Sequence, residues 1–260
     1  MISRREVLSW LGVSAGACAV SAGSPLSAAP VKGRSERDPR VLNLESFSVT
    51  KVEHSARLHA YLRDTLLPRM EQIHRGPRLY LDAIVAPHTP QAALLAVFSS
   101  FEEMLDIRAS LESNPPIRHA RADLESARVL EAVQSQVLVV SQKSLHLPAD
   151  LESFEKGVLE VRSYDAPAWH AGPPSSVSDV FRRAGMDPIV SAATAAGEHM
   201  LCFTYVIPFE SLAAREQAWT ALDADPEWMA MQRESANKYG AAVTATSKSI
   251  YKLAPYCRLG

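Results

Sequence analysis

The chain has 260 residues, of which 47% are hydrophobic and 22% charged, and its formal net charge is −2. This is an ordinary globular composition, with room for one large domain or two of about 100 residues. There is no basic surplus to neutralise a row of phosphates, so we expect no nucleic-acid partner. After the first thirty residues, no apolar run is long enough to span a membrane.

Residues 1–28 have the layout of an export signal. Paired Arg4 and Arg5 precede a weakly apolar stretch, and small residues follow it. The stretch SRREVL resembles a twin-arginine signal, with Val7 where Phe is commoner. We therefore expect a twin-arginine signal peptide and a periplasmic or secreted protein, with general secretion as the alternative. Residues 29–40 are polar, contain Pro and Gly, and predict a linker.

Two cysteines, Cys202 and Cys257, remain after such a signal is removed. An oxidising periplasm permits a disulfide between them, and two free thiols are the alternative. The third cysteine, Cys18, would permit lipidation, although an aliphatic residue is missing three positions before it. The chain has no C-x-x-C pair, no H-E-x-x-H and no His/carboxylate cluster with ligand spacing, so we expect no metal.

Residues 41–147 predict a first domain with strands and helices in the order β-α-β-β-α-β. Alternating or apolar runs predict strands, and helical spacing of apolar residues predicts helices. The expected strands are 41–49, 78–86, 93–100 and 136–145, and the expected helices are 52–74, 101–113 and 117–133.

Residues 155–256 repeat this order and predict a second domain. The expected strands are 157–165, 189–193, 201–207 and 242–253, and the expected helices are 176–185, 210–224 and 226–240. Short matches support a duplication: SFEE from Ser100 and PFES from Pro208 lie 108 residues apart. The pattern predicts an α+β chain of two tandem ferredoxin-like βαββαβ domains. Their bare sheet faces can meet in a barrel within one chain, and a homodimer is a further option.

Four motifs of the second half together resemble the NIPSNAP family. They are LEVRSY (159–164), GMDPIVS (185–191), AAREQAWTAL (213–222) and DADPEWMAMQRES (223–235). The resemblance covers about residues 155–254, and it reaches the first half only through the repeat. It implies a dimeric-type α-β barrel but no agreed chemistry, since that superfamily includes cofactor-independent oxygenases, isomerases and haem-binding enzymes. Fold alone does not assign an activity.

The second half departs from the family pattern after its first strand. Family members carry a long helix there, whereas this chain has APAWHAGPPSSVSD at 166–179. The prolines and glycine delay the helix, so it cannot begin before about Ser175.

The stretch DPEW at 225–228 predicts a helix start. Asp225 suits the N-cap, Pro226 suits the first helical position, and the glutamate that follows complements the helix dipole. We expect Trp228 to pack against Trp219 or Leu222 of the preceding helix; a ligand-facing aromatic is the alternative.

Strand alternation in LEVRSY separates two sets of side chains. Leu159, Val161 and Ser163 are expected to pack against helices, while the other three residues are expected to line the barrel. That lining set comprises Glu160, Arg162 and Tyr164.

The equivalent strand of the first half places Asn43, Glu45 and Phe47 on the same expected lining face. The offset of 162 − 45 = 117 makes Glu45 and Arg162 equivalent positions of opposite charge. They could form a structural ion pair that closes the barrel, because buried charges need partners. Alternatively, Arg162 and Tyr164 hold an anionic or phenolic ligand.

The sequence therefore indicates an exported NIPSNAP-like protein that is small-molecule-binding or structural through a barrel cavity. The alternative is a cofactor-independent oxygenase or isomerase acting on a small apolar or anionic substrate with Arg162, Tyr164 and His199. His199 or His170 could also serve as an axial haem ligand, but we expect no cofactor. The candidate ligand-binding residues are Glu45, Phe47, Glu160, Arg162, Tyr164, His199, Phe203, Tyr205 and Trp228.

Overall fold

The fold comes from a computed structural model that describes residues 40–140, 144–147, 154–165, 176–197, 200, 202–240 and 245–258. The expected signal peptide, nearly all of the expected linker, His170 and His199 lie outside the described residues. Among the described helices, none is both long enough and apolar enough to cross a membrane.

The first half contains the expected elements in the expected order. They are β1 (Arg40–Val49), the helical segments η1 (Val52–His54), α2 (Ser55–Tyr61), η2 (Leu62–Leu66) and α3 (Leu67–Ile73), then β2 (Arg78–Val85), β3 (Gln91–Phe98), α4 (Phe101–Glu112), α5 (Pro115–Ser126) and β4 (Leu130–Val140). The prediction of a helix over 117–133 was wrong at its end. The chain leaves α5 through Arg128, whose φ is +51°. Leu130 then pairs with Val49 in the sheet.

The second half repeats the order with a shorter first helix. Its elements are β5 (Val158–Asp165), α6 (Ser176–Arg183), β6 (Val190–Ala196), β7 (Cys202–Phe209), α7 (Leu212–Asp223), α8 (Pro226–Tyr239) and β8 (Ala245–Leu253). The described part of helix α6 runs from Ser176 to Arg183, and residues 166–175, within which the prolines predicted no early helix start, lie outside the described residues.

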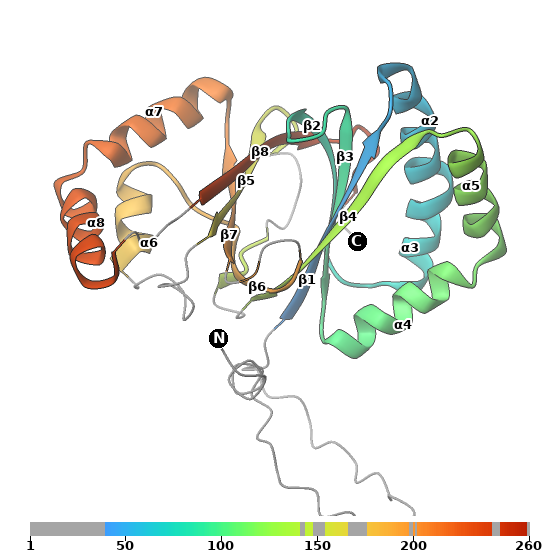
Figure 1. The fold of residues 1–260 in the computed structure, drawn as a ribbon, viewed down its shortest axis with the longest axis horizontal. Helices are drawn as coiled ribbons and strands as arrows, with labels where there is room; N and C mark the ends of the chain where they lie inside the picture. The colour runs from blue at the N-terminus through green and yellow to red at the C-terminus, as the bar shows by residue number, and fades with distance from the viewer. Residues whose placement is uncertain are drawn as a thin grey trace, which may run out of the picture. The chain divides into compact units, whose positions relative to one another are not determined.

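The strands form one closed antiparallel barrel in the order β1-β3-β2-β8-β5-β7-β6-β4. Each half contributes four strands in the same internal order, β4-β1-β3-β2 and β8-β5-β7-β6, and the halves join at the β2–β8 and β6–β4 edges. Helices α2 to α5 cover the outside of the first half, and α6 to α8 cover the outside of the second (Figure 1). The predicted α+β barrel of two ferredoxin-like repeats is thus confirmed, and it closes within one chain.

The register relates the two halves residue by residue. Glu45 lies opposite Leu94, and Arg162 lies opposite Tyr205. These pairs confirm that Glu45 and Arg162 are equivalent. The helices α4 and α7 begin after N-cap serines with the same backbone angles, φ −164° and ψ 168°. The serines are Ser100 and Ser211, so the true offset here is 211 − 100 = 111, and the expected SFEE/PFES match was three residues out.

The assignment of strand faces was inverted. Leu159 and Val161 belong to the apolar cluster inside the barrel, together with Leu42 and Leu44 of β1. Their neighbours on β5 face outward, toward the helices. The physical reason is that a barrel of eight strands has an interior that side chains fill, so its apolar face turns inward.

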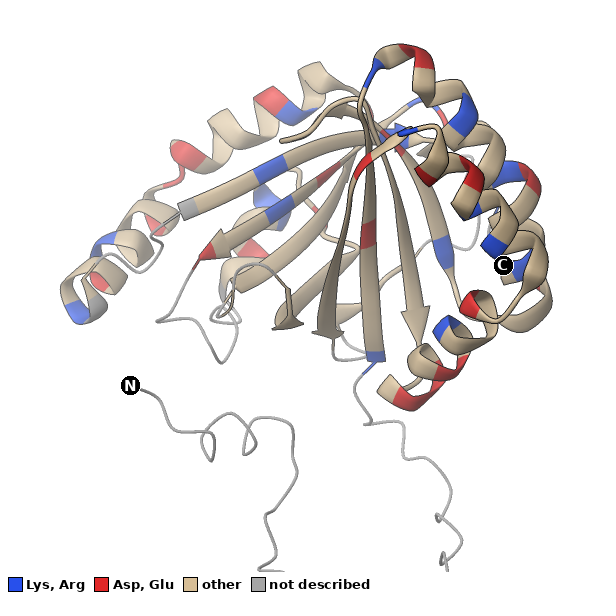
Figure 2. Cartoon of the chain, turned by 45° about the vertical axis from the view of Figure 1, so that its right-hand side comes forward, with Lys and Arg blue, Asp and Glu red and all other residues tan. Residues whose placement is uncertain are grey.

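Phe47, Phe203 and Tyr205 face outward as well. Phe47 belongs to the cluster under α2 to α5, and the two aromatic residues of β7 belong to the cluster under α6 to α8. Lys, Arg, Asp and Glu lie mostly on the helices, and few lie on the strands (Figure 2). Among the described residues, the candidates expected to line a barrel cavity thus lie between the sheet and the helices instead.

Candidate functional site

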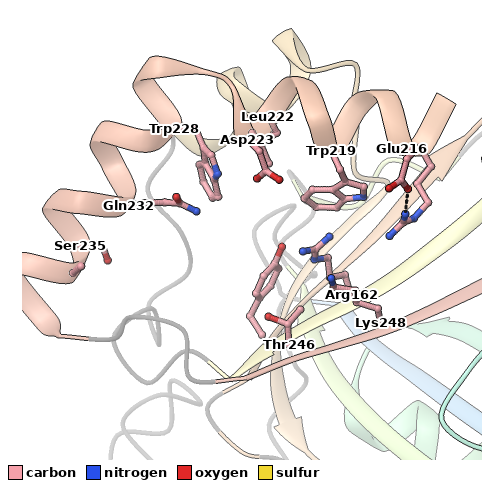
Figure 3. A pocket seen from close by; sticks show the side chains of 13 residues that line it. Arg162, Glu216, Trp219, Leu222, Asp223, Trp228, Gln232, Ser235, Thr246 and Lys248 are labelled. Atoms are coloured by element: carbon pink, nitrogen blue, oxygen red, sulfur yellow. Dashed lines mark hydrogen bonds and ion pairs between the residues drawn. The ribbon is translucent and has the colours of Figure 1, made fainter. Parts of the chain in front are cut away.

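A pocket of about 540 Å³ lies between the outer face of the β5–β8 pair and helices α7 and α8 (Figure 3). Side chains at alternate positions of the two strands form its floor, and one face of each helix forms its walls. The residues that line it are Arg162, Tyr164, Thr246 and Lys248 from the strands, Arg215, Glu216, Trp219, Leu222 and Asp223 from α7, and Trp228, Gln232, Ser235 and Ala236 from α8.

The corner between α7 and α8 is built by the DPEW stretch. The side chain of Asp225 accepts hydrogen bonds from the backbone nitrogens of Glu227 at 2.8 Å and Trp228 at 3.0 Å. Pro226 takes the first helical position, so the predicted helix start is confirmed. Arg183 of α6 donates to Asp225 at 3.1 Å and to Glu227 at 2.8 Å, which joins the third helix to the corner.

Trp228 packs against the preceding helix, as expected, and it also lines the pocket. It is 9% exposed and packs with Leu222 and with Phe181, whose ring centroid lies 6.0 Å away. The same indole lines the pocket, and its Nε1 has no hydrogen-bond partner among the described residues. Trp228 thus anchors the corner and also forms part of the pocket wall.

Glu160 organises the inner end of the pocket. Its carboxylate is fully buried and accepts from Arg215 Nε at 2.8 Å, Trp219 Nε1 at 2.8 Å and Arg162 at 3.4 Å. A buried carboxylate needs such partners because it has lost its hydration. Glu160 therefore ties β5 to α7 and holds two guanidinium groups at one end of the pocket.

Arg162 lies between this carboxylate and the aromatic walls. Its guanidinium carbon is 3.6 Å from the centre of the Trp219 ring and 5.3 Å from that of Tyr164, both within the range of cation–π contacts. Its Nε has no hydrogen-bond partner among the described residues. The expected ion pair with Glu45 is absent from this arrangement, because Arg162 pairs with Glu160 instead.

Tyr164 forms part of the floor of the pocket. Burial raises the pKa of Tyr164 to about 12, although the charge of Arg162 opposes the shift. The phenol is therefore protonated at neutral pH and cannot serve there as a general base. Its ring stands edge-on to Tyr205 at a centroid distance of 6.0 Å, so Tyr205 supports the floor from the neighbouring strand.

The equivalent region of the first half is covered. Glu45 lies beneath helices, where burial raises the pKa of its carboxyl and the charges of Arg108 and Arg121 oppose that shift. Arg121 also donates to the hydroxyl of Tyr61 on α2 at 3.0 Å, and Phe47 is 2% exposed. Glu45 and Phe47 thus belong to a packed layer rather than to the pocket.

The pocket corresponds to a difference between the halves in their first helices. In the first half a helical run from Val52 to Ile73 follows β1, whereas in the second half the described helix α6 has only eight residues. The first-half run places Tyr61 near Glu45. Among the described residues, α6 supplies no side chain to the lining of the pocket beside Arg162.

The cysteines have separate environments. Cys202 is buried and donates to Asp165 at 2.7 Å, and burial raises the pKa of its thiol to about 12. Cys257 accepts from the backbone nitrogen of Tyr80 at 3.2 Å. Both thiols are free, so the structure contains the unbridged alternative. Within the described residues, no group of three His, Cys, Asp or Glu side chains could hold a metal ion.

Several pocket residues were not among the candidates from the sequence. Arg215, Trp219, Leu222 and Asp223 recur at intervals of four, three and one, the spacing of one helix face. The corresponding residues of α8 recur at helical intervals from Trp228. This helical spacing, shared by α7 and α8, was the signal in the sequence that could have indicated these residues. It could not show that the two helix faces pack over the same pair of strands.

Comparison with known proteins agrees with the barrel. An anthrone oxidase-like protein shares 12% identity over 87% of this chain and 95% of its own, with a TM-score of 0.55. A candidate monooxygenase from Fusobacterium nucleatum shares 7% identity over 83% and 92%, with a TM-score of 0.53. A mutant form of chlorite dismutase from Candidatus Nitrospira defluvii shares 9% over 84% and 92%, with a TM-score of 0.50.

Likenesses at such low identity establish the fold alone. The chain is an α+β protein of the dimeric α-β barrel type, with both halves of the barrel in one polypeptide. Residues 157–258 match the NIPSNAP family model, which is the region where the four motifs predicted the resemblance. No curated protein matches the chain.

Proposed function

We propose that this protein binds a small molecule in the pocket between β5–β8 and α7–α8, and not inside the barrel. The observation that carries the proposal is a cavity of about 540 Å³ whose lining combines cationic and aromatic side chains, with Arg162, Lys248 and Trp228 among them. Three of the lining residues also carry a buried polar atom without a partner among the described residues: Arg162 Nε, Trp228 Nε1 and Ser235 Oγ. Concave pockets lined by aromatic side chains and a few polar or charged groups are typical of small-molecule sites.

The barrel interior does not support the expected internal ligand. The two halves of the barrel contribute one continuous cluster of buried apolar side chains, including Leu42, Leu95, Val161 and Val206. At one end, Gln136 donates to Thr194 at 3.1 Å. Such packing is the normal interior of a small barrel and stabilises it.

An oxygenase or isomerase acting on the bound molecule is the alternative. The names of two fold neighbours, an anthrone oxidase-like protein and a candidate monooxygenase, are consistent with such chemistry but concern those proteins. Of its expected residues, Arg162 and Tyr164 line the pocket, but the raised pKa of Tyr164 favours a hydrogen-bonding role over proton abstraction. Incubating the protein with its ligand in air and analysing the products would separate an enzyme from a binding protein.

Native mass spectrometry of protein purified from its own host tests the binding proposal. We expect a reproducible small molecule in the native spectrum that is released on denaturation. An Arg162→Met variant should lose it, because this change removes the charge and the unpartnered Nε. An Arg63→Met variant is the control, since Arg63 is exposed on η2 and pairs only with its neighbour Asp64 among the described residues. Equal retention by the two variants would contradict the proposed site.

We also propose that the protein is exported by the twin-arginine route. The support is the SRREVL stretch followed by weakly apolar and small residues. Replacing Arg4 and Arg5 together by lysine should leave the protein in the cytoplasmic fraction. Unchanged export of that variant, measured by cell fractionation, would instead indicate general secretion.

A further inference from the structure

We propose that the pocket takes a small aromatic acid that also carries a hydroxyl or amino donor. Its carboxylate would lie over Arg162 and Lys248, its ring beside Trp228, and its donor at Asp223. This inference rests on the proposed function and specifies the chemical class of the ligand.

Two cationic residues on neighbouring strands define the end of the pocket that would hold the carboxylate of the ligand. Arg162 and Lys248 are directly opposite in the β5–β8 register, and both line the pocket. Like charges at directly opposed positions destabilise a strand pair. No ion pair joins Lys248 to any described residue, and Arg162 shares its carboxylate partner, Glu160, with two other donors. An anionic group placed between the two cations would compensate both.

The other carboxylates near this end are already engaged or lie elsewhere. Glu216 accepts from Arg215 at 2.9 Å, so the second guanidinium is divided between two carboxylates. Asp223 lies one helical turn further along α7 than Trp219, toward Trp228 (Figure 3). The positive charge at the β5–β8 floor is therefore not cancelled locally by acidic residues of the wall.

The middle of the pocket is aromatic. The Trp219 face is occupied by Arg162 at 3.6 Å and its Nε1 by Glu160, so this indole completes the anion end. Trp228 and Tyr164 remain as pocket walls, and Trp228 Nε1 is without a partner among the described residues. Planar rings stack or pack edge-on against such walls, which favours a flat ring over a branched aliphatic body.

The donor end is set by Asp223. Its carboxylate points into the space between Trp219 and Trp228 (Figure 3), and its charge contributes to the raised pKa of Tyr164 on the floor. No hydrogen bond or ion pair joins the side chain of Asp223 to another described residue. A ligand with a carboxylate alone would face this acidic group without compensation. A hydroxyl or amino group at the far side of the ring would instead donate to it.

Three probes of matched shape test the class by calorimetric titration of the mature chain: 4-hydroxybenzoate, benzoate and 4-hydroxybenzamide. We expect 4-hydroxybenzoate to bind most tightly. Losing the donor or the charge should each weaken binding by roughly tenfold to a hundredfold, the range for hydrogen bonds to charged groups.

Two variants test which side chains of the pocket cause these losses of binding affinity. Lys248→Met should weaken both benzoates and leave the benzamide unchanged, while Asp223→Asn should remove the advantage of the hydroxyl. Lys252→Met is the matched control, because Lys252 lies on the same strand and pairs with Asp82 away from the pocket. It should bind all three probes like the unchanged chain.

The outcomes separate this inference from the proposed function. If 4-hydroxybenzamide binds as tightly as 4-hydroxybenzoate, the requirement for a carboxylate on the ligand is wrong. If benzoate binds as tightly as 4-hydroxybenzoate, the requirement for a hydroxyl or amino donor is wrong. If a co-purifying molecule that depends on Arg162 is uncharged or aliphatic, the class is wrong while the binding function stands. If no probe binds and no molecule co-purifies, both proposals fall.

Discussion

The buried carboxylate of Glu160 and the guanidinium of Arg215 are joined by two hydrogen bonds, of 2.8 and 3.2 Å, across the gap between β5 and α7. This bidentate pair fixes the distance between the sheet and the helix that carries most of the pocket wall. Such pairs combine strength with geometric specificity. The shape of the pocket therefore depends on one residue that does not itself line it.

Replacing Glu160 by alanine should lower the free energy of unfolding by about 3–5 kcal/mol, because it leaves buried cations without a counter-charge. Urea denaturation measures the change, and Glu160→Gln keeps the shape if the alanine variant does not fold. Glu216→Ala is the control. Its carboxylate is 76% exposed although it contacts the same arginine, so its loss should cost less than about 1 kcal/mol. Similar losses in both variants would contradict a dominant role for Glu160.

Replacing Asp225 by alanine should destabilise the protein, because it removes both the N-cap of α8 and the hydrogen bonds from Arg183. The same change at Ser211, the N-cap of α7, should also destabilise the protein but should not affect ligand binding through the Trp228 corner. Thermal unfolding gives the first quantity and titration of the bound molecule the second. A ligand affinity that falls equally in both variants would show that the α7–α8 corner has no special part in the site.

The inward face of the barrel can be tested at Leu42, which is fully buried in the interior cluster. Leu42→Ala should lower the free energy of unfolding by about 2–5 kcal/mol, the usual cost of a core cavity. Val133→Ala on β4 is a matched control, since Val133 is 48% exposed and should tolerate the change within about 0.5 kcal/mol. A small loss at Leu42 would show that the interior is not packed as described.

Stability should decrease at mildly acidic pH because of His74. This imidazole is fully buried against Phe98, and burial lowers its pKa although Glu103 opposes the shift. The unfolded chain therefore binds the proton more readily than the folded one. The full free energy of unfolding is present above about pH 6.5 and falls as the pH drops through the lower folded pKa.

Urea denaturation between about pH 8 and pH 5 would measure this slope, and His74→Phe should flatten it. The two proteins differ only at position 74, so the difference between the two curves isolates His74. Parallel curves would mean that His74 is not the group responsible.

Much of the local structure could be predicted from residues that lie close together in sequence. The start of α8 at Pro226 followed from an Asp-Pro pair, and the side chain of Asp225 caps that helix as predicted. The end of α5 could not be predicted, because the apolar residues after Ser126 fit a helix as well as the strand β4 that pairs with β1. Caps and breakers act within a turn, whereas strand pairing depends on distant partners.

The sequence by itself determined the duplication, the order of elements, the NIPSNAP resemblance and the equivalence of Glu45 with Arg162. Only the tertiary structure decided which face of each strand is inside. Alternation separates Leu159 and Val161 from Arg162 and Tyr164, but it does not show which set the barrel encloses.

The pocket likewise depends on the tertiary structure and could not be located from the sequence. It combines two strands whose facing residues, Arg162 and Lys248, are 248 − 162 = 86 positions apart, with one face from each of two helices. Closure of the barrel turns the apolar faces inward, where packing stabilises them most, and this leaves the charged and aromatic faces between the sheet and the helices. Of the candidate residues, Arg162, Tyr164 and Trp228 line this pocket, and the space arises only when β5, β8, α7 and α8 pack together.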